Sequence, residues 1–197
     1  DKSVNTNNAT QSLSDKQPQL GNQKVIFDGL NDILELPTLG LSEKATVVFL
    51  FTPMNDGGYS VIGSSTQNDH WDRYGSNGLT YVNHFTQLRI NNLALNMPTS
   101  GDQILAYVGD SLSPSYEVRL NGFSVYKIFN SFSFIDNISK IGSALASGSE
   151  FNGSISEIII LNDSSLNDLR KLEGYLANKW DLTANLPAEH PYKSFSP

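Results

Sequence analysis

Residues 116–126 read Tyr116-Glu117-Val118-Arg119-Leu120-Asn121-Gly122-Phe123-Ser124-Val125-Tyr126. Two runs of alternating apolar and polar residues flank the pair Asn121-Gly122. A period of two is typical of a β-strand, because successive side chains point to opposite faces of the sheet. Asn-Gly supplies the two positive φ angles of a type I′ turn, the usual connection of a tight hairpin. The stretch therefore predicts a β-hairpin with its turn at Asn121-Gly122.

Similar runs continue in both directions from this hairpin. They are short, rich in β-branched and aromatic residues, and bounded by Gly, Pro, Asn and Asp. The expected strands are 25–27, 33–36 (ended by Pro37), 45–51 (ended by Pro53), 59–63, 79–85, 88–90, 104–108, 140–143 and 151–161, the last buried on both faces near its end. Residues 64–78 are expected to form a long loop. Many short strands predict an all-β fold, an antiparallel β-sandwich or jelly roll.

One amphipathic helix is predicted near the C-terminus. Ser165 fits its N-cap, and Asp168 three residues later completes a capping box. A single apolar stripe at helical spacing holds Leu166, Leu169, Leu172, Leu176 and Trp180. The stripe predicts a helix face packed on the core, Trp180 included. An extended tail, 186–192, follows, and we expect His190 within it to pack or to form hydrogen bonds.

The domain prediction has two parts. Residues 1–23 are polar and are expected to form an N-terminal arm that packs on, or leads into, the domain. Residues 24–197 are expected to form one β-sandwich domain.

Composition excludes several function classes. The chain of 197 residues carries a net charge of −7 and no cysteine. An acidic surface repels phosphate backbones and anionic lipids, so we expect no nucleic-acid partner and no membrane insertion. Disulfide frameworks and cysteine-based metal or catalytic sites are absent by composition.

Three segments resemble a concanavalin A-like, laminin-G-like family. The first comprises residues 8–11, 17–18 and 27–32, the last of which read Phe27-Asp28-Gly29-Leu30-Asn31-Asp32. The second is the strand 151–161 with the helix that follows it, through 172–180. The third is 186–192, Leu186-Pro187-Ala188-Glu189-His190-Pro191-Tyr192. The resemblance implies a jelly-roll domain of the kind found in phage virion and tail-associated proteins and in secreted or surface proteins of bacteria. It therefore implies an extracellular, cell-surface or virion location. The family's first strand, which carries a Trp, would precede Asp1.

A sugar site is predicted around the 64–78 segment. An aromatic ring stacks on the apolar face of a pyranose, and neighbouring polar side chains bond its hydroxyls. The candidate ligand-binding residues are Asp69, Trp71, Arg73, Tyr74, Tyr81 and Arg89. The alternative is that Trp71 covers the core and that Arg73 pairs with Asp69 or Asp72.

Calcium is the one cofactor that the sequence suggests. Asn55, Asp56 and Asp72 are candidate ligands, because this hard cation takes oxygen donors from loops. The alternative is turn chemistry, in which Asp and Asn bond their own backbone. Asp28 and Asp32 are expected to fix a turn.

No catalytic motif is apparent. Glycosidases need two facing carboxylates, and the glutamates here stand alone in the sequence, Glu157 being structural by the family resemblance. We expect a non-catalytic, lectin-like carbohydrate-binding or adhesion module whose partner is a glycan or host-surface polysaccharide. The alternatives are a structural or assembly subunit of a virion or surface filament, which would bind other subunits, and a polysaccharide-cleaving enzyme.

Overall fold

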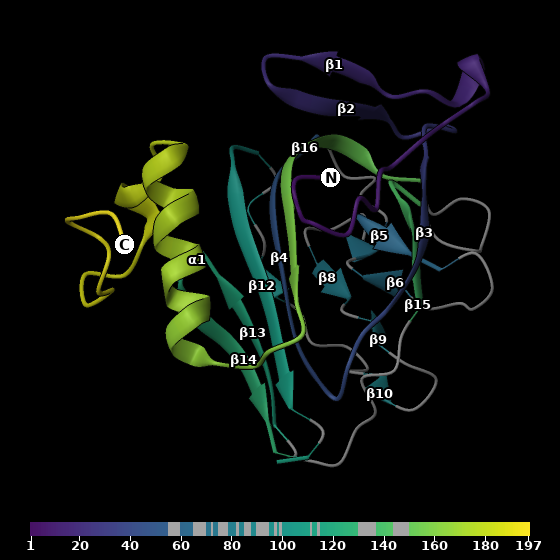
Figure 1. Ribbon diagram of the computed structural model, residues 1–197. Helices are drawn as coiled ribbons and strands as arrows, with labels where there is room; N and C mark the ends of the chain where they lie inside the picture. The colour runs from purple at the N-terminus through teal and green to yellow at the C-terminus, as the bar shows by residue number, and fades with distance from the viewer. Residues whose placement is uncertain are drawn as a thin grey trace. The chain divides into compact units, whose positions relative to one another are not determined.

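The computed structural model describes most of the chain in two compact units. The described residues are 1–54, 60–64, 70–71, 73–74, 79–81, 83–84, 88–89, 95–96, 98, 100–110, 112–113, 115–129, 137–143 and 150–197. Unit 1 comprises Asp1–Leu41, Pro53–Gly101 and Ile135–Ser154, and unit 2 comprises Ser42–Thr52, Asp102–Phe134 and Ile155–Pro197. The strands pair antiparallel, and one α-helix occurs in the described part (Figure 1). The expected all-β sandwich class is confirmed.

Unit 1 consists of short strands. The bounds are β1 Gln19–Gly21, β2 Lys24–Asp28, β3 Leu34–Gly40, β5 Ile62–Gly63, β6 His70–Trp71, β7 Arg73–Tyr74, β8 Leu79–Tyr81, β9 Asn83–His84, β10 Leu88–Arg89, β11 Leu95–Asn96 and β15 Asn137–Ile141, with a 3-10 turn η1 at Ser14–Lys16. They form sheets in the orders β3-β15-β5-β6, β11-β8-β7 and β10-β9, and β1 pairs with β2. Unit 1 therefore gathers the strands on which the predicted sugar residues fall.

Unit 2 is built on longer strands and the helix. They are β4 Lys44–Pro53, β12 Gln103–Asp110, β13 Ser115–Leu120, β14 Phe123–Ile128 and the greater part of β16 Asn152–Leu161. Their order is β16-β4-β12-β13-β14. Helix α1, Leu166–Lys179, runs beside β12 and β13 and is followed by a 3-10 turn η2, Thr183–Asn185 (Figure 1).

Both faces of the central strands of unit 2 are buried. On one face, Val48 and Leu50 of β4 and Ile104 and Ala106 of β12 pack with α1. The opposite face carries the larger side chains, including Phe49, which meets Tyr107 edge-on with ring centroids 6.0 Å apart. Each such side chain contributes roughly 1.5–3 kcal/mol through burial. A sheet buried on both faces explains why 45–51 is apolar without interruption.

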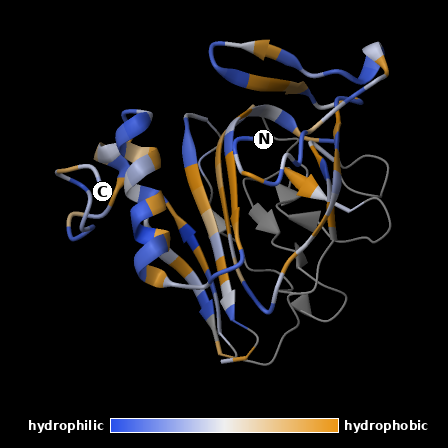
Figure 2. Ribbon diagram, viewed as in Figure 1, coloured by the Kyte–Doolittle hydropathy of each residue, from blue (hydrophilic) through white to orange (hydrophobic). Residues whose placement is uncertain are grey.

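The helix prediction is confirmed with two exceptions. The Ser165 hydroxyl accepts a hydrogen bond from the Asp168 backbone N–H, as an N-cap should. The Ser165 N–H donates to Asp163 Oδ1 at 3.2 Å and not to Asp168, so the predicted capping box is not completed. Apolar and polar segments alternate along α1 in Figure 2, and Leu169 and Leu176 are fully buried. Leu166 is 38% exposed because it occupies the first position of the helix, at the margin of the core. No helix among the described residues has the length and apolar character that crossing a bilayer requires.

The predicted hairpin is also confirmed. Leu120 of β13 stands opposite Phe123 of β14, so the turn is the pair Asn121-Gly122. The φ angles are 48° at Asn121 and 82° at Gly122. The Asn121 side chain adds a hydrogen bond from the Ile104 N–H at 2.8 Å, which ties the turn to β12.

Three local predictions were wrong. Pro37 does not end the strand but lies within β3, which is the last strand in the order of its sheet and has an irregular register with β15 at this point, so Pro37 interrupts no backbone hydrogen bond. The expected loop 64–78 contains β6 and β7. Residues 158–161 are half-buried and not buried on both faces. Residues 19–21 of the expected N-terminal arm form β1, which is joined to β2 by Asn22 and Gln23 with φ of 50° and 62°.

Candidate functional site

The predicted sugar residues fall on the short strands of unit 1. Trp71 ends β6, Arg73 and Tyr74 form β7, Tyr81 ends β8 and Arg89 ends β10. A stretch that the sequence suggested was a loop is therefore held by backbone pairing on several strands. Such pairing fixes the spacing of the residues better than a loop would.

The strand register brings two of these residues together. Arg73 stands directly opposite Tyr81 in the β7–β8 pair, and Tyr74 opposite Thr80. Directly opposed residues of antiparallel strands have Cβ atoms about 4.5–5.5 Å apart. The register thus sets Arg73 and Tyr81 at opposed positions of paired strands, and these are residue types that can bond sugar hydroxyls and stack on a sugar ring.

Trp71 and Arg89 lie on other strand pairs of the same unit. Trp71 stands opposite Ile62 of β5, and Arg89 stands opposite Asn83 of β9. Strand β6 also lies against β9. Strand β9 thus lies next to both β6, which carries Trp71, and β10, which carries Arg89. Strands β7 and β8, which carry Arg73 and Tyr81, pair with each other directly.

The remaining candidates lie outside the described residues. These are Asp69 of the sugar site and all three calcium candidates, Asn55, Asp56 and Asp72. The calcium site and the alternative pairing of Arg73 with Asp69 or Asp72 stay predictions. Within the described part of the chain, no group of three or more His, Asp or Glu side chains could hold a metal ion.

Asp28 and Asp32 fix a turn, as the sequence predicts. The Asp28 carboxylate accepts from the Leu30 N–H at 2.8 Å and the Asn31 N–H at 3.3 Å, and Asp32 accepts from the Asp28 N–H at 2.9 Å. Burial acts to raise the pKa of Asp28, but these backbone donors outweigh it and lower the pKa. The pKa of Asp32 is raised, by burial and by the charge of Asp28.

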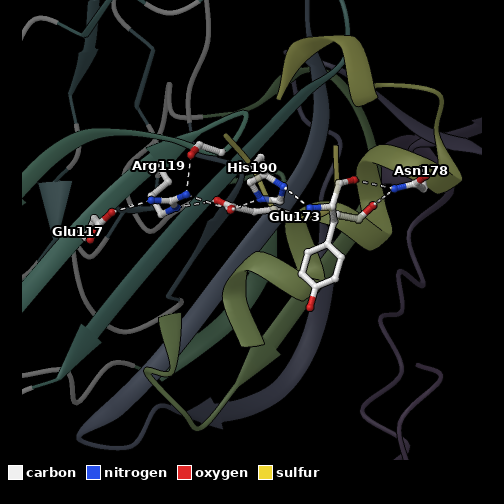
Figure 3. A network of polar contacts seen from close by, with 8 residues as sticks. Glu117, Arg119, Glu173, Asn178 and His190 are labelled. Atoms are coloured by element: carbon white, nitrogen blue, oxygen red, sulfur yellow. Dashed lines mark hydrogen bonds and ion pairs between the residues drawn. The ribbon is translucent and has the colours of Figure 1, made fainter. Parts of the chain in front are cut away.

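The most elaborate polar cluster of the described residues lies in unit 2, between β13 and α1 (Figure 3). The Arg119 guanidinium donates from Nε to Glu173 Oε1 at 2.8 Å and from Nη2 to Glu173 Oε2 at 3.1 Å. Its Nη1 donates to Glu117 Oε1 at 2.9 Å, and Lys127 donates to the other oxygen of Glu117 at 3.0 Å. His190 Nε2 lies 3.2 Å from Glu173 Oε2. Two carboxylates therefore share one buried guanidinium.

This cluster is suited to holding elements together. Glu173 is fully buried, and Glu117, Arg119 and His190 are each 6% exposed. Burial acts to raise the pKa of Glu117, but hydrogen bonds from Arg119, Lys127 and Ser124 outweigh it and lower the pKa. A carboxyl with a lowered pKa stays ionised at neutral pH, so Glu117 is a poor general acid.

Sequence reasoning missed this cluster, although two signals were present. Glu117 and Arg119 alternate with apolar residues, which places both on one face of β13. Glu173 falls four residues after Leu169 and three before Leu176, inside the apolar stripe of α1. A charge in such a stripe indicates a buried ion pair. The predicted packing or hydrogen-bonding role of His190 is confirmed, since its ring is buried and lies against Glu173. The predicted structural role of Glu157 is confirmed as well, since Glu157 accepts from the Trp180 Nε1–H and pairs with Lys179 at 2.9 Å.

The fold is shared with solved jelly-roll domains, whereas no protein-family model and no curated protein matches the chain. Domain 4 of AbnA, an extracellular GH43 arabinanase from Geobacillus stearothermophilus solved with arabinotriose, aligns over 70% of this chain and 69% of its own, with 19% identity and a TM-score of 0.55. The CBM40 of the Ruminococcus gnavus IT-sialidase, bound to α2,3-sialyllactose, aligns over 78% and 97%, with 16% identity and a TM-score of 0.52.

A third similar structure is the native heptameric SAP-like pentraxin of Limulus polyphemus. It aligns over 81% of this chain and 79% of its own, with 13% identity and a TM-score of 0.52. At these identities the likeness establishes the fold. It agrees with the concanavalin A-like architecture that the sequence resemblance implies.

Proposed function

We propose that this chain is a non-catalytic, lectin-like carbohydrate-binding module. The observation that carries the proposal is the opposition of Arg73 and Tyr81 on β7 and β8, with Trp71 two residues before Arg73. Aromatic rings beside a rigid, multidentate hydrogen-bond donor are the groups that sugar recognition uses. The fold likeness to the arabinotriose-bound and sialyllactose-bound domains adds support by analogy.

We further propose where the protein acts and which kind of glycan it binds. The resemblance to laminin-G-like domains of phage virions and bacterial surfaces favours an extracellular adhesion role, with a host-surface polysaccharide as the ligand. A non-catalytic role agrees with the buried cluster, because Glu117 and Glu173 are both bonded to Arg119 and neither is free to attack a glycosidic bond.

Glycan-array binding by the purified chain tests the proposal. Tyr81→Ala and Arg73→Ala should each remove most of the signal, while circular dichroism and the melting temperature stay unchanged. Tyr175→Ala and Arg170→Ala are matched controls, because they delete the same side-chain types from exposed positions of α1. A blank array together with self-association in solution would favour the assembly-subunit alternative. Release of reducing ends from a bound polysaccharide would show an enzyme.

Calcium is proposed as an accessory ligand through Asn55, Asp56 and Asp72. Repeating the array after chelation tests this role. Signal that is lost with chelator and restored by added calcium supports the site. Signal that is unchanged assigns these three residues to turn chemistry.

A further inference from the structure

The C-terminal residues 186–193, here called the strap, lie against both α1 and the β13–β14 turn. Leu186 is 2% exposed and belongs to the apolar core that α1 shares with β4 and β12. Four residues further on, His190 is buried as well. The end of the strap is tied to η2, because Lys193 Nζ donates to the carbonyls of Thr183 and Ala184, each at 3.2 Å, and to that of Leu186.

On the helix side, the strap lies directly on the backbone of α1. A Cβ atom at Gly174 would come within 2.3 Å of Tyr192 Cβ, so only glycine fits there. Asn178 Nδ2 donates to the Gly174 carbonyl at 2.9 Å and to the Tyr192 carbonyl at 3.3 Å (Figure 3). The amide of Asn178 thus joins the last turns of the helix to the strap.

On the sheet side, the strap fills the space above the hairpin turn. A Cβ atom at Gly122 would lie 2.9 Å from Pro187 Cδ and 3.2 Å from His190 Cδ2. The Gly122 carbonyl in turn accepts a hydrogen bond from Arg119. The strap is therefore held between two elements that are distant in the sequence.

The His190 ring completes the connection. The Tyr192 N–H donates to His190 Nδ1 at 3.3 Å, so Nδ1 is an acceptor and the ring hydrogen sits on Nε2. Nε2 then donates to Glu173 Oε2, the same oxygen that receives Arg119 Nη2. One carboxylate oxygen of α1 thus joins the sheet and the strap.

We propose that the strap is a clasp that keeps α1 docked on the sheet, with His190 as its key residue. When the clasp opens, α1 and the strap leave together as one cooperative unit, while β4, β12 and β13 remain paired. The reason is that the strands keep their backbone hydrogen bonds to one another without the helix. The helix, in contrast, loses its polar contacts at Glu173 and its apolar packing on the sheet in the same step. This device is independent of glycan binding.

Amide hydrogen exchange of the full chain, followed by mass spectrometry, tests the clasp. In His190→Ala, peptides from α1 should exchange roughly tenfold faster or more, since a buried hydrogen bond is lost, while peptides from β12 keep their wild-type rates. Glu189→Ala is the matched control, because this neighbouring side chain is exposed. It should leave both regions unchanged.

Gly174→Ala separates the clasp from helix propensity. Alanine favours a helix over glycine, so α1 alone would become more stable. The clash with Tyr192 should nevertheless open the clasp and speed exchange in α1. Exchange in α1 that slows or stays constant in both variants would overturn the proposal. So would an equal rise in β12, because the helix would then have no separate opening.

Discussion

Arg119 of β13 and Glu173 of α1 form a two-point ion pair across the helix–sheet interface, with both nitrogen–oxygen distances at or below 3.1 Å. The two side chains are 7% and 0% exposed. The pair defines where α1 sits along β13, because a planar guanidinium accepts a carboxylate in few orientations. An uncompensated charge in this place would be costly.

We predict that Glu173→Ala lowers the free energy of unfolding by about 3–5 kcal/mol, the usual cost of breaking a buried pair by removing one partner. Urea denaturation at pH 7 measures it. Lys171→Ala, which breaks the exposed 2.8 Å pair with Asp168, is the control and should change stability little. Equal effects of the two variants would contradict a special role for Glu173.

Stability should depend on the ionisation of Glu117. Its pKa is lowered in the folded state, so its contribution is complete above the unfolded-state value of about 4.3 and is lost as the pH falls through the folded value. Urea denaturation from pH 7 to pH 3 should show a shallower acid decline in Glu117→Gln than in the wild type. Glu189→Gln should keep the wild-type slope. Parallel curves for all three proteins would rule out this linkage.

Gly142→Ala should destabilise unit 1. The residue has φ of +86°, and a Cβ atom would lie 2.3 Å from the Phe27 ring. Backbone strain alone costs roughly 1–3 kcal/mol, and the clash with a fully buried ring adds to it. Gly101→Ala is an informative comparison, since Gly101 shares a positive φ of 77° but is exposed. Thermal melts should rank Gly142→Ala well below Gly101→Ala; the reverse order would refute the packing argument.

Ser165→Ala should cost about 1 kcal/mol of stability, because the hydroxyl caps the first turn of α1 through the Asp168 N–H at 3.3 Å. Chemical denaturation measures the difference. Ser164→Ala, one position earlier, is the control and should behave like the wild type. A loss that is equal at both positions would mean that the cap is not the cause.

Local signals were enough to predict the hairpin and the helix. Asn121-Gly122 favours its turn through backbone angles that few other residue pairs adopt. Ser165 marks the start of α1 through a hydrogen bond to a residue only three positions further along the chain. The candidate sugar residues were chosen from residue type alone. The expectation that they lie close together rested on assigning 64–78 to a loop, and that assignment was wrong. Only the register of β7 and β8 set Arg73 against Tyr81.

The long-range contacts were decided by the folded chain. Arg119 and Glu173 are 54 positions apart, and Glu173 and His190 are 17 apart, so nothing in either local pattern pairs them. Pro37 likewise reads as a strand breaker until its place on an edge strand is known. Periodicity and turn chemistry act over a few residues and specify elements. Burial makes each buried charge find a partner, and which partner it finds depends on how those elements pack.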